Sequence, residues 1–117
     1  MTGVCCEGMG SVLDIESHVR NGVGVVRLQG DVDLDTVDRL VDAVEVATPP
    51  AGSVEVDLRA VGFIDSAGVA GLNRCRRHAA RVGADVTVRC LDGGAVAKLL
   101  QWTGLSRVLD VRVDPAA

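Results

Sequence analysis

The chain has 117 residues, of which 48% are hydrophobic, and its formal net charge is −4. This length fits one domain, and that hydrophobic content can fill one core. An acidic chain with no tyrosine, one phenylalanine and one tryptophan lacks the positive field and the aromatic platforms of nucleic-acid-binding proteins. Its apolar runs are far shorter than the roughly 20 residues of a membrane span, and its start does not resemble a secretion signal. We therefore expect a cytoplasmic protein that has no membrane span and binds no nucleic acid.

The first part of the chain predicts a hairpin followed by a helix. Residues 12–19 and 23–28 are rich in alternating or β-branched apolar residues, and Asn21-Gly22 between them is a strong hairpin signal. After Gly30 the apolar residues recur at helical spacing, and Pro49-Pro50 ends this predicted helix. Its inward-facing residues are expected to be Leu34, Val37, Leu40, Val41 and Val44.

The rest of the chain alternates between strand and helix patterns. This order, β β α β α β α β, predicts a single α/β domain with a mixed sheet and helices packed against it. We assign residues 1–11 to a flexible N-terminal segment, 12–113 to the domain and 114–117 to a C-terminal tail. The predicted elements of the second part are a strand at 54–58, a helix from Ser66 to about Val82 that stops at Gly83, a strand at 85–91, a helix at 95–102 and an edge strand at 108–113.

The four cysteines do not form a CxxC pair, so their spacing does not predict a metal site. In a cytoplasmic chain they are expected to be thiols. Cys75 and Cys90 stand among apolar residues and are predicted to be small core residues. A redox role for this pair is the alternative. The remaining two cysteines are Cys5 and Cys6.

Ser66 is the most informative residue, because it stands where an apolar strand and turn give way to a helix. A serine at a helix start can cap the helix, or it can stay reachable for chemistry by another protein. In α/β sheets, functional residues collect beyond the carboxyl ends of strands, where Asp65 and Ser66 fall. The residues that follow are small, which predicts a low surface that a partner can approach closely. They are Ala67, Gly68, Ala70 and Gly71.

Ser66 is poorly suited to be a hydrolase nucleophile, because that chemistry needs a histidine base nearby. The chain has two histidines. His18 belongs to the first predicted strand, and His78 is about 18 Å from Ser66 along the same predicted helix. The nucleophile-elbow motif of such hydrolases has a glycine two residues before the serine, and in this chain that position is Ile64. We therefore do not expect an enzyme.

The acidic run at 30–36 mimics two other sites. Asp31, Asp33 and Asp35 have the spacing of a calcium loop, but Thr36 and Asp42 stand where that loop needs glycine and glutamate. The same run also mimics an aspartyl phosphotransferase motif, although it leads into a helix instead of closing a buried strand. A strand-to-helix turn whose carboxylates favour the helix N-terminus explains the run better. No metal or cofactor is predicted.

Several of these segments together resemble one known family. They are GDVDLDT at 30–36, VEVDLRAVGFIDSAG at 54–68, the helix that stops at Gly83 and a short helix that ends in TGL. Over residues 12–113 the chain resembles the STAS-domain family, especially the bacterial anti-sigma factor antagonists. The resemblance implies a non-catalytic protein that binds a serine-kinase-type anti-sigma factor and so releases a sigma factor.

The resemblance also implies that the partner kinase phosphorylates Ser66 and thereby ends binding, so ATP and magnesium would belong to the kinase. The alternative is a STAS module that does not switch, either an accessory subunit of a lipid-transport ATPase or a scaffold in a signalling assembly. A second copy of the chain is a further candidate partner. The expected partner surface consists of Gly30, Asp31, Asp33, Asp65, Ser66, Ala67, Gly68, Ala70, Gly71 and Arg74.

Overall fold

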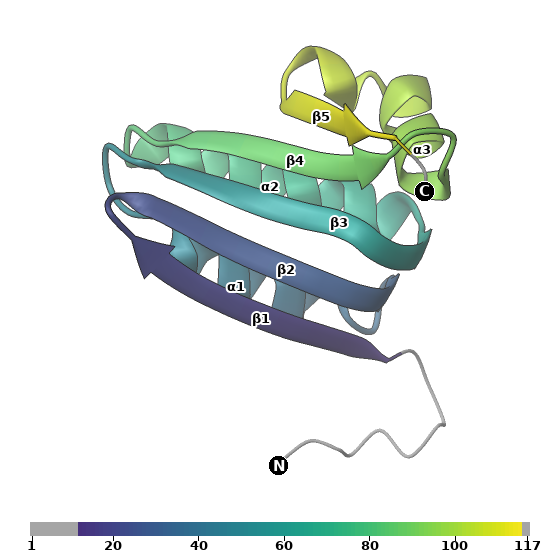
Figure 1. Ribbon diagram of the computed structural model, residues 1–117, viewed down its shortest axis with the longest axis horizontal. Helices are drawn as coiled ribbons and strands as arrows, with labels where there is room; N and C mark the ends of the chain where they lie inside the picture. The colour runs from purple at the N-terminus through teal and green to yellow at the C-terminus, as the bar shows by residue number, and fades with distance from the viewer. Residues whose placement is uncertain (1–11, 116–117) are drawn as a thin grey trace.

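The computed structural model describes residues 12–115, which form one five-stranded sheet with helices packed against it (Figure 1). The strand order is β1-β2-β3-β4-β5, with β1 antiparallel to β2 and the other neighbours parallel. The predicted fold class is confirmed. The elements are β1 (Leu13–Arg20), β2 (Val23–Val32), α1 (Val37–Ala47), β3 (Ser53–Ile64), α2 (Ser66–Arg81), β4 (Asp85–Leu91), α3 (Ala95–Thr103), the 3-10 turn η1 (Leu105–Arg107) and β5 (Asp110–Asp114).

The predicted hairpin forms as expected. Asn21 and Gly22 both have positive φ, 54° and 77°, as a two-residue type I′ turn requires. The turn joins β1 and β2, whose pairing runs from Leu13 opposite Gly30 to Arg20 opposite Val23. The proposed flexible segment 1–11, with Cys5 and Cys6, lies outside the described residues.

Several predicted boundaries are wrong. Leu34 does not belong to the inner face of α1, because that helix begins only at Val37 and Leu34 lies 77% exposed in the preceding turn. The last strand begins at Asp110 instead of 108, since η1 and the residues after it carry the chain back to the sheet edge. The strands β2 and β3 are longer than predicted and end at Val32 and Ile64.

The hydrophobic core lies between the sheet and its helices, with α1 and α2 behind the sheet in Figure 1. Cys75 and Cys90 are buried in this core as free thiols, which confirms their predicted place. Burial raises the pKa of the Cys75 thiol to about 12, so this thiol stays protonated at neutral pH. None of the helices in residues 12–115 has the length and hydropathy needed to cross a membrane. The largest fully buried side chains include Leu28, Leu40, Leu58, Leu72 and Leu100.

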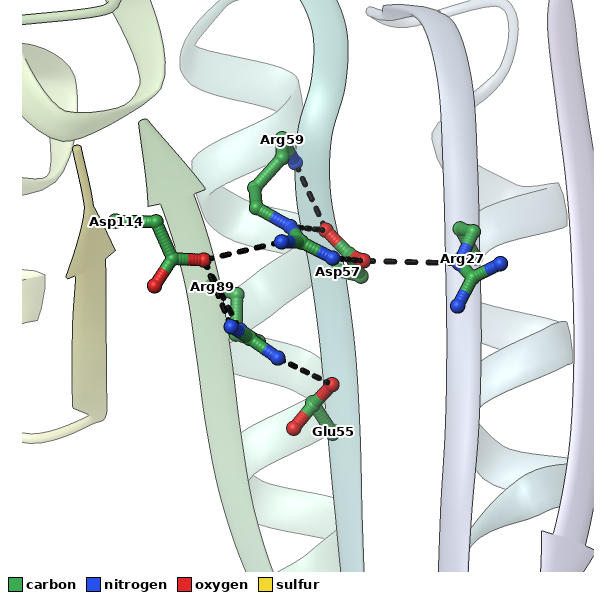
Figure 2. Close-up of polar contacts among 6 residues, drawn as sticks. All are labelled: Arg27, Glu55, Asp57, Arg59, Arg89 and Asp114. Atoms are coloured by element: carbon green, nitrogen blue, oxygen red, sulfur yellow. Dashed lines mark hydrogen bonds and ion pairs between the residues drawn. The ribbon is translucent and has the colours of Figure 1, made fainter. Parts of the chain in front are cut away.

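The opposite face of the sheet carries a network of ion pairs (Figure 2). Asp57 on β3 is only 3% exposed, and its carboxylate accepts hydrogen bonds from Arg59 Nε at 3.0 Å and Nη2 at 2.8 Å. Arg27 on β2 approaches the same carboxylate at 3.7 Å. Asp114 at the end of β5 contacts Arg59 Nη1 at 3.3 Å and Arg89 Nη2 at 2.9 Å. The network therefore ties four strands together on the side that α1 and α2 leave uncovered.

Candidate functional site

Two turns meet at the carboxyl ends of β2 and β3. These strands are parallel, with Asp31 opposite Phe63 and Val32 opposite Ile64. The backbone N–H of Asp65 donates to the carbonyl oxygen of Val32 at 3.3 Å. The acidic turn after β2 is therefore adjacent to the start of α2, although the two segments are about thirty residues apart in sequence.

Ser66 is the first residue of α2, and its side chain is exposed. The cap of this helix is Asp65, whose Oδ1 accepts the backbone N–H groups of Ala67 at 3.0 Å and Gly68 at 3.2 Å. The interpretation of Ser66 as the helix cap is therefore wrong. Within the described residues its hydroxyl makes no hydrogen bond, and it remains accessible to another molecule.

The acidic turn is organised by its own side chains. Asp33 Oδ1 accepts the backbone N–H groups of Asp35 at 2.9 Å and Thr36 at 3.2 Å. The buried hydroxyl of Thr36 donates to the carbonyl oxygen of Asp31 at 2.8 Å. Asp33 thus fixes the backbone that leads into α1, as a side chain at the start of a helix commonly does.

Gly68 and Gly71 do not lie on the exposed surface, so that part of the expected partner surface is wrong. A Cβ on Gly68 would come within 2.6 Å of Ile64 Cγ1, and a Cβ on Gly71 within 2.3 Å of Val37 Cγ2. Both glycines face inward and let α2 approach β3 and α1 closely. The low surface next to Ser66 consists instead of Ala67 and Ala70.

Arg74 lies on the exposed side of α2 and forms an ion pair with Asp38 of α1 at 3.2 Å. Both side chains are at least half exposed, so this pair contributes little to stability and can exchange partners.

Gly30 has a φ of 122° and lies against the start of β1, where a Cβ would come within 2.2 Å of the Val12 carbonyl oxygen. Its role at this end of the sheet is to allow that close approach.

Two exposed apolar side chains at this end were missed from the sequence. Leu34 is 77% exposed in the acidic turn, and Phe63 is 49% exposed near the end of β3. Since Phe63 is opposite Asp31 in the sheet, it borders the same turn. No regular alternation marked its exposure, because the burial pattern of β3 becomes irregular after Leu58, where the pairing with β2 shifts register.

A groove of about 470 Å³ runs from Ser66 along α2. Its other wall is the end of α3 and η1, which no sequence pattern linked to Ser66. Trp102, which precedes Thr103 in α3, is 84% exposed. The groove is lined by Ser66, Val69, Ala70, Asn73, Thr103, Gly104, Leu105 and Val108.

Neither histidine accompanies Ser66. His18 lies on β1, at the edge of the sheet, and His78 lies in the last turn of α2. Twelve residues of helix separate His78 from Ser66, a distance of about 18 Å. The site therefore has an accessible hydroxyl without the base that a serine nucleophile requires.

A family model described as "Mlab, STAS domain" matches residues 18–110, and the chain belongs to the STAS domain family. No curated protein matches it in sequence. Among solved structures, an anti-sigma factor antagonist from Mycobacterium paratuberculosis is similar with a TM-score of 0.74 and 22% identity, covering 86% of each chain. The anti-sigma factor antagonist SpoIIAA in its unphosphorylated form is similar with a TM-score of 0.60 and 23% identity, covering 91% of this chain and 89% of that one. The phosphorylated form of SpoIIAA from Bacillus has a TM-score of 0.56 and 22% identity, with coverage of 91% and 92%.

Proposed function

We propose that this chain is an anti-sigma factor antagonist that binds a serine-kinase-type anti-sigma factor and is switched off by phosphorylation of Ser66. The observation that carries the proposal is the exposed Ser66 hydroxyl at the start of α2, where Asp65 already serves as the cap. A hydroxyl that is not needed for the fold can be modified without unfolding the helix. The lack of a histidine near Ser66 leaves a serine nucleophile without its base, which supports binding rather than catalysis as the activity of this site.

The partner surface would combine the acidic turn, Ser66 and the small side chains of Ala67 and Ala70. Leu34 and Phe63 add exposed apolar area at this end of the sheet, and Trp102 is a further exposed apolar side chain, on α3. Aromatic side chains are enriched among the residues that dominate binding energy at protein interfaces. In this chain both aromatic residues are on the surface instead of in the core.

Phosphorylation would change this surface mainly through charge. A phosphate adds about −1.5 to −2 charges at neutral pH. The first free N–H groups of α2 are already bonded to the Asp65 carboxylate, so the phosphate would stand beside a second anion. Like charges and added bulk at an interface can weaken binding by several kcal/mol. The folded domain itself need not change.

The second candidate function is a STAS module that does not switch, such as an accessory subunit of a lipid-transport ATPase or a scaffold. The matching family model is described as "Mlab, STAS domain" and not as an anti-sigma factor antagonist, and this description is the reason to keep the second candidate. Such a module would use the same surface for permanent binding, with Ser66 left unmodified. The two candidates differ in whether a kinase acts on Ser66.

The test is incubation of the full chain with ATP and the serine-kinase-type anti-sigma factor from the same cell. We expect one phosphate by intact-mass spectrometry, absent in Ser66→Ala and retained in the control Ser17→Ala, whose serine is exposed on β1. We also expect Ser66→Asp to weaken binding to the unphosphorylated partner at least tenfold, measured by calorimetry. An unchanged affinity of Ser66→Asp, or a phosphate retained in Ser66→Ala, would refute the switch and leave the non-switching module.

A further inference from the structure

Strand β1 is an edge of the sheet, and within residues 12–115 no strand pairs with its outer side (Figure 1). Its pairing with β2 runs from Leu13 to Arg20 without a register shift. The strand contains no proline, which would remove a backbone donor from its outer side. The outer side of β1 therefore presents a regular row of backbone donors and acceptors.

The structure identifies which residues form this row. The N–H of Asp31 donates to the carbonyl oxygen of Val12 at 3.0 Å, so Val12 and Asp31 are a hydrogen-bonded pair of the ladder. Since such pairs alternate along an antiparallel ladder, the even-numbered residues of β1 bond to β2. The position of Arg20 and Val23 on either side of the two-residue turn agrees with this assignment. The residues whose backbone groups point away from the sheet are Leu13, Ile15, Ser17 and Val19.

The even-numbered side chains of β1 lie on the uncovered face of the sheet, and all of them are acidic or basic. They read Asp14, Glu16, His18 and Arg20, so the acidic residues come first and the basic residues last. All four are exposed. Within residues 12–115 none of them takes part in an ion pair. A strand with this order of charges is complementary to itself when reversed.

We propose that two copies of this chain associate through their β1 strands, paired antiparallel about a two-fold axis at Ser17. In this register Ser17 faces its own copy and both backbones offer outward-pointing groups, as a hydrogen-bonded pair requires. Asp14 lies opposite the partner's Arg20, and Glu16 opposite the partner's His18. On the helix side of the sheet, Ile15 lies opposite the partner's Val19. The two-fold axis makes each of these pairs occur twice.

Neighbouring registers lose this complementarity. With the axis moved two residues toward the N-terminus, Asp14 would lie opposite Glu16. With the axis moved two residues toward the C-terminus, His18 would lie opposite Arg20. With the axis at residue 16 instead of Ser17, Glu16 would lie opposite the partner's Glu16, and with the axis at residue 18, His18 would lie opposite the partner's His18. Like charges directly opposite each other destabilise a strand pair, so the register at Ser17 is favoured.

The other edge of the sheet is a poorer candidate for self-pairing. Full-length antiparallel pairing of β5 with itself would place Asp110 opposite Asp114 and Arg112 opposite its own copy. In addition, β5 has only five residues, against eight in β1. The dimer is therefore expected to use β1 and to join two five-stranded sheets into one. Because Ser66 lies at the end of β3 and not on this edge, the phosphorylation test does not depend on the outcome.

The first test measures the dimer dissociation constant of the full chain by sedimentation equilibrium. Arg20→Glu places two acidic pairs across the axis and is expected to raise this constant about tenfold. The matched control is Arg77→Glu, the same charge change at an exposed position of α2, and it is expected to leave the constant unchanged. The exchange Asp14→Arg with Arg20→Glu restores opposite charges and is expected to restore dimerisation. A monomeric wild-type chain, or failure of the charge exchange to recover dimerisation, would overturn the proposal.

The second test does not depend on the folding of charge variants. Hydrogen-bonded residues of antiparallel strands have Cα atoms about 5.5 Å apart, within the range that a disulfide spans. In a Cys5→Ser/Cys6→Ser background, Ser17→Cys is therefore expected to form a covalent dimer under mild oxidation, seen by non-reducing electrophoresis. Val19→Cys is the control, because Val19 would lie opposite the partner's Ile15 and far from its own copy. Equal cross-linking of both variants, or none by Ser17→Cys, would overturn the register.

Discussion

Gly71 illustrates how a residue in a surface helix can be required for packing. Glycine costs about 1 kcal/mol relative to alanine inside a helix, so sequence alone favours a replacement. In the structure, however, Gly71 is buried where α2 crosses α1, with no room for a methyl group beside Val37. The close approach of the two helices therefore outweighs the intrinsic preference of α2.

We predict that Gly71→Ala lowers the free energy of unfolding by about 1 to 3 kcal/mol, because the added methyl group overpacks the contact with Val37. Urea unfolding followed by circular dichroism would measure this change. Gly62→Ala is the control, since a Cβ at that position meets nothing within 4 Å. Adding Val37→Ala to Gly71→Ala should recover part of the loss. A more stable Gly71→Ala variant would mean that the helices can separate without cost.

The inward direction of Gly68 and Gly71 could not be read from the sequence. Small residues after a helix start fit a low exposed surface as well as a close helix contact, and only the position of α1 decides between them. The exposure of Leu34 could not be read from the sequence either, because the helical spacing of apolar residues extends back to Leu34, three residues before α1 begins. The side chains of Asp33 and Thr36 hold a turn there and delay the helix to Val37.

At the level of elements, the sequence predicted the order and type of every strand and α-helix. Period-two and period-3.6 patterns are strong in this chain, and glycine and proline mark most boundaries. The nearness of the acidic turn to the start of α2 was expected only from the family resemblance, and the parallel pairing of β2 with β3 accounts for it. The groove beside Ser66 was not predicted, because it depends on where α3 and η1 return to the sheet.

The last strand is held by a side chain as well as by its backbone. Asp114 ends β5 and contacts Arg59 of β3 and Arg89 of β4 (Figure 2). Among the described strands, the short edge strand β5 pairs with β4 alone. Asp114 thus links it to the centre of the sheet.

We predict that Asp114→Ala loosens β5 and destabilises the domain by about 1 kcal/mol, a modest value because the pair is partly exposed. Hydrogen exchange of the β5 amides should become faster, while exchange in β2 stays as in the wild type. Arg112→Ala in the same strand is the control, because the exposed Arg112 side chain forms its ion pair with Asp110 of β5 itself, at 3.6 Å. Equal acceleration in both variants would show that the contacts of Asp114 do not hold the strand.

For the whole molecule, the uncovered sheet face is organised around a buried carboxylate. The alternation of Val54, Val56 and Leu58 with charged residues predicts that Asp57 lies on the outer face, and it does, yet Asp57 is buried there. The guanidinium group of Arg59 covers it from the solvent side. Hydrogen bonds from Arg59 lower the pKa of Asp57 below its usual value, against the opposing effect of burial.

This lowered pKa makes the stability of the fold depend on acid pH. Because the folded state binds the proton of Asp57 less readily than the unfolded state, the stabilisation is complete above the ordinary pKa of about 3.9. It is lost as the pH falls through the lower pKa of the folded state. Asp57→Asn removes the charge and should destabilise the domain by about 1 to 3 kcal/mol at pH 7.

The difference between wild type and Asp57→Asn should therefore shrink as the pH falls below about 4. Urea unfolding at intervals from neutral to acid pH would measure both curves. Asp42→Asn, an exposed position on α1, is the control and should follow the wild type closely. If the difference at Asp57 stayed constant down to the lowest pH, its hydrogen-bonding geometry rather than its charge would stabilise the sheet. The charged face would then act as a rigid polar surface whose stability does not depend on ionisation of its central carboxylate.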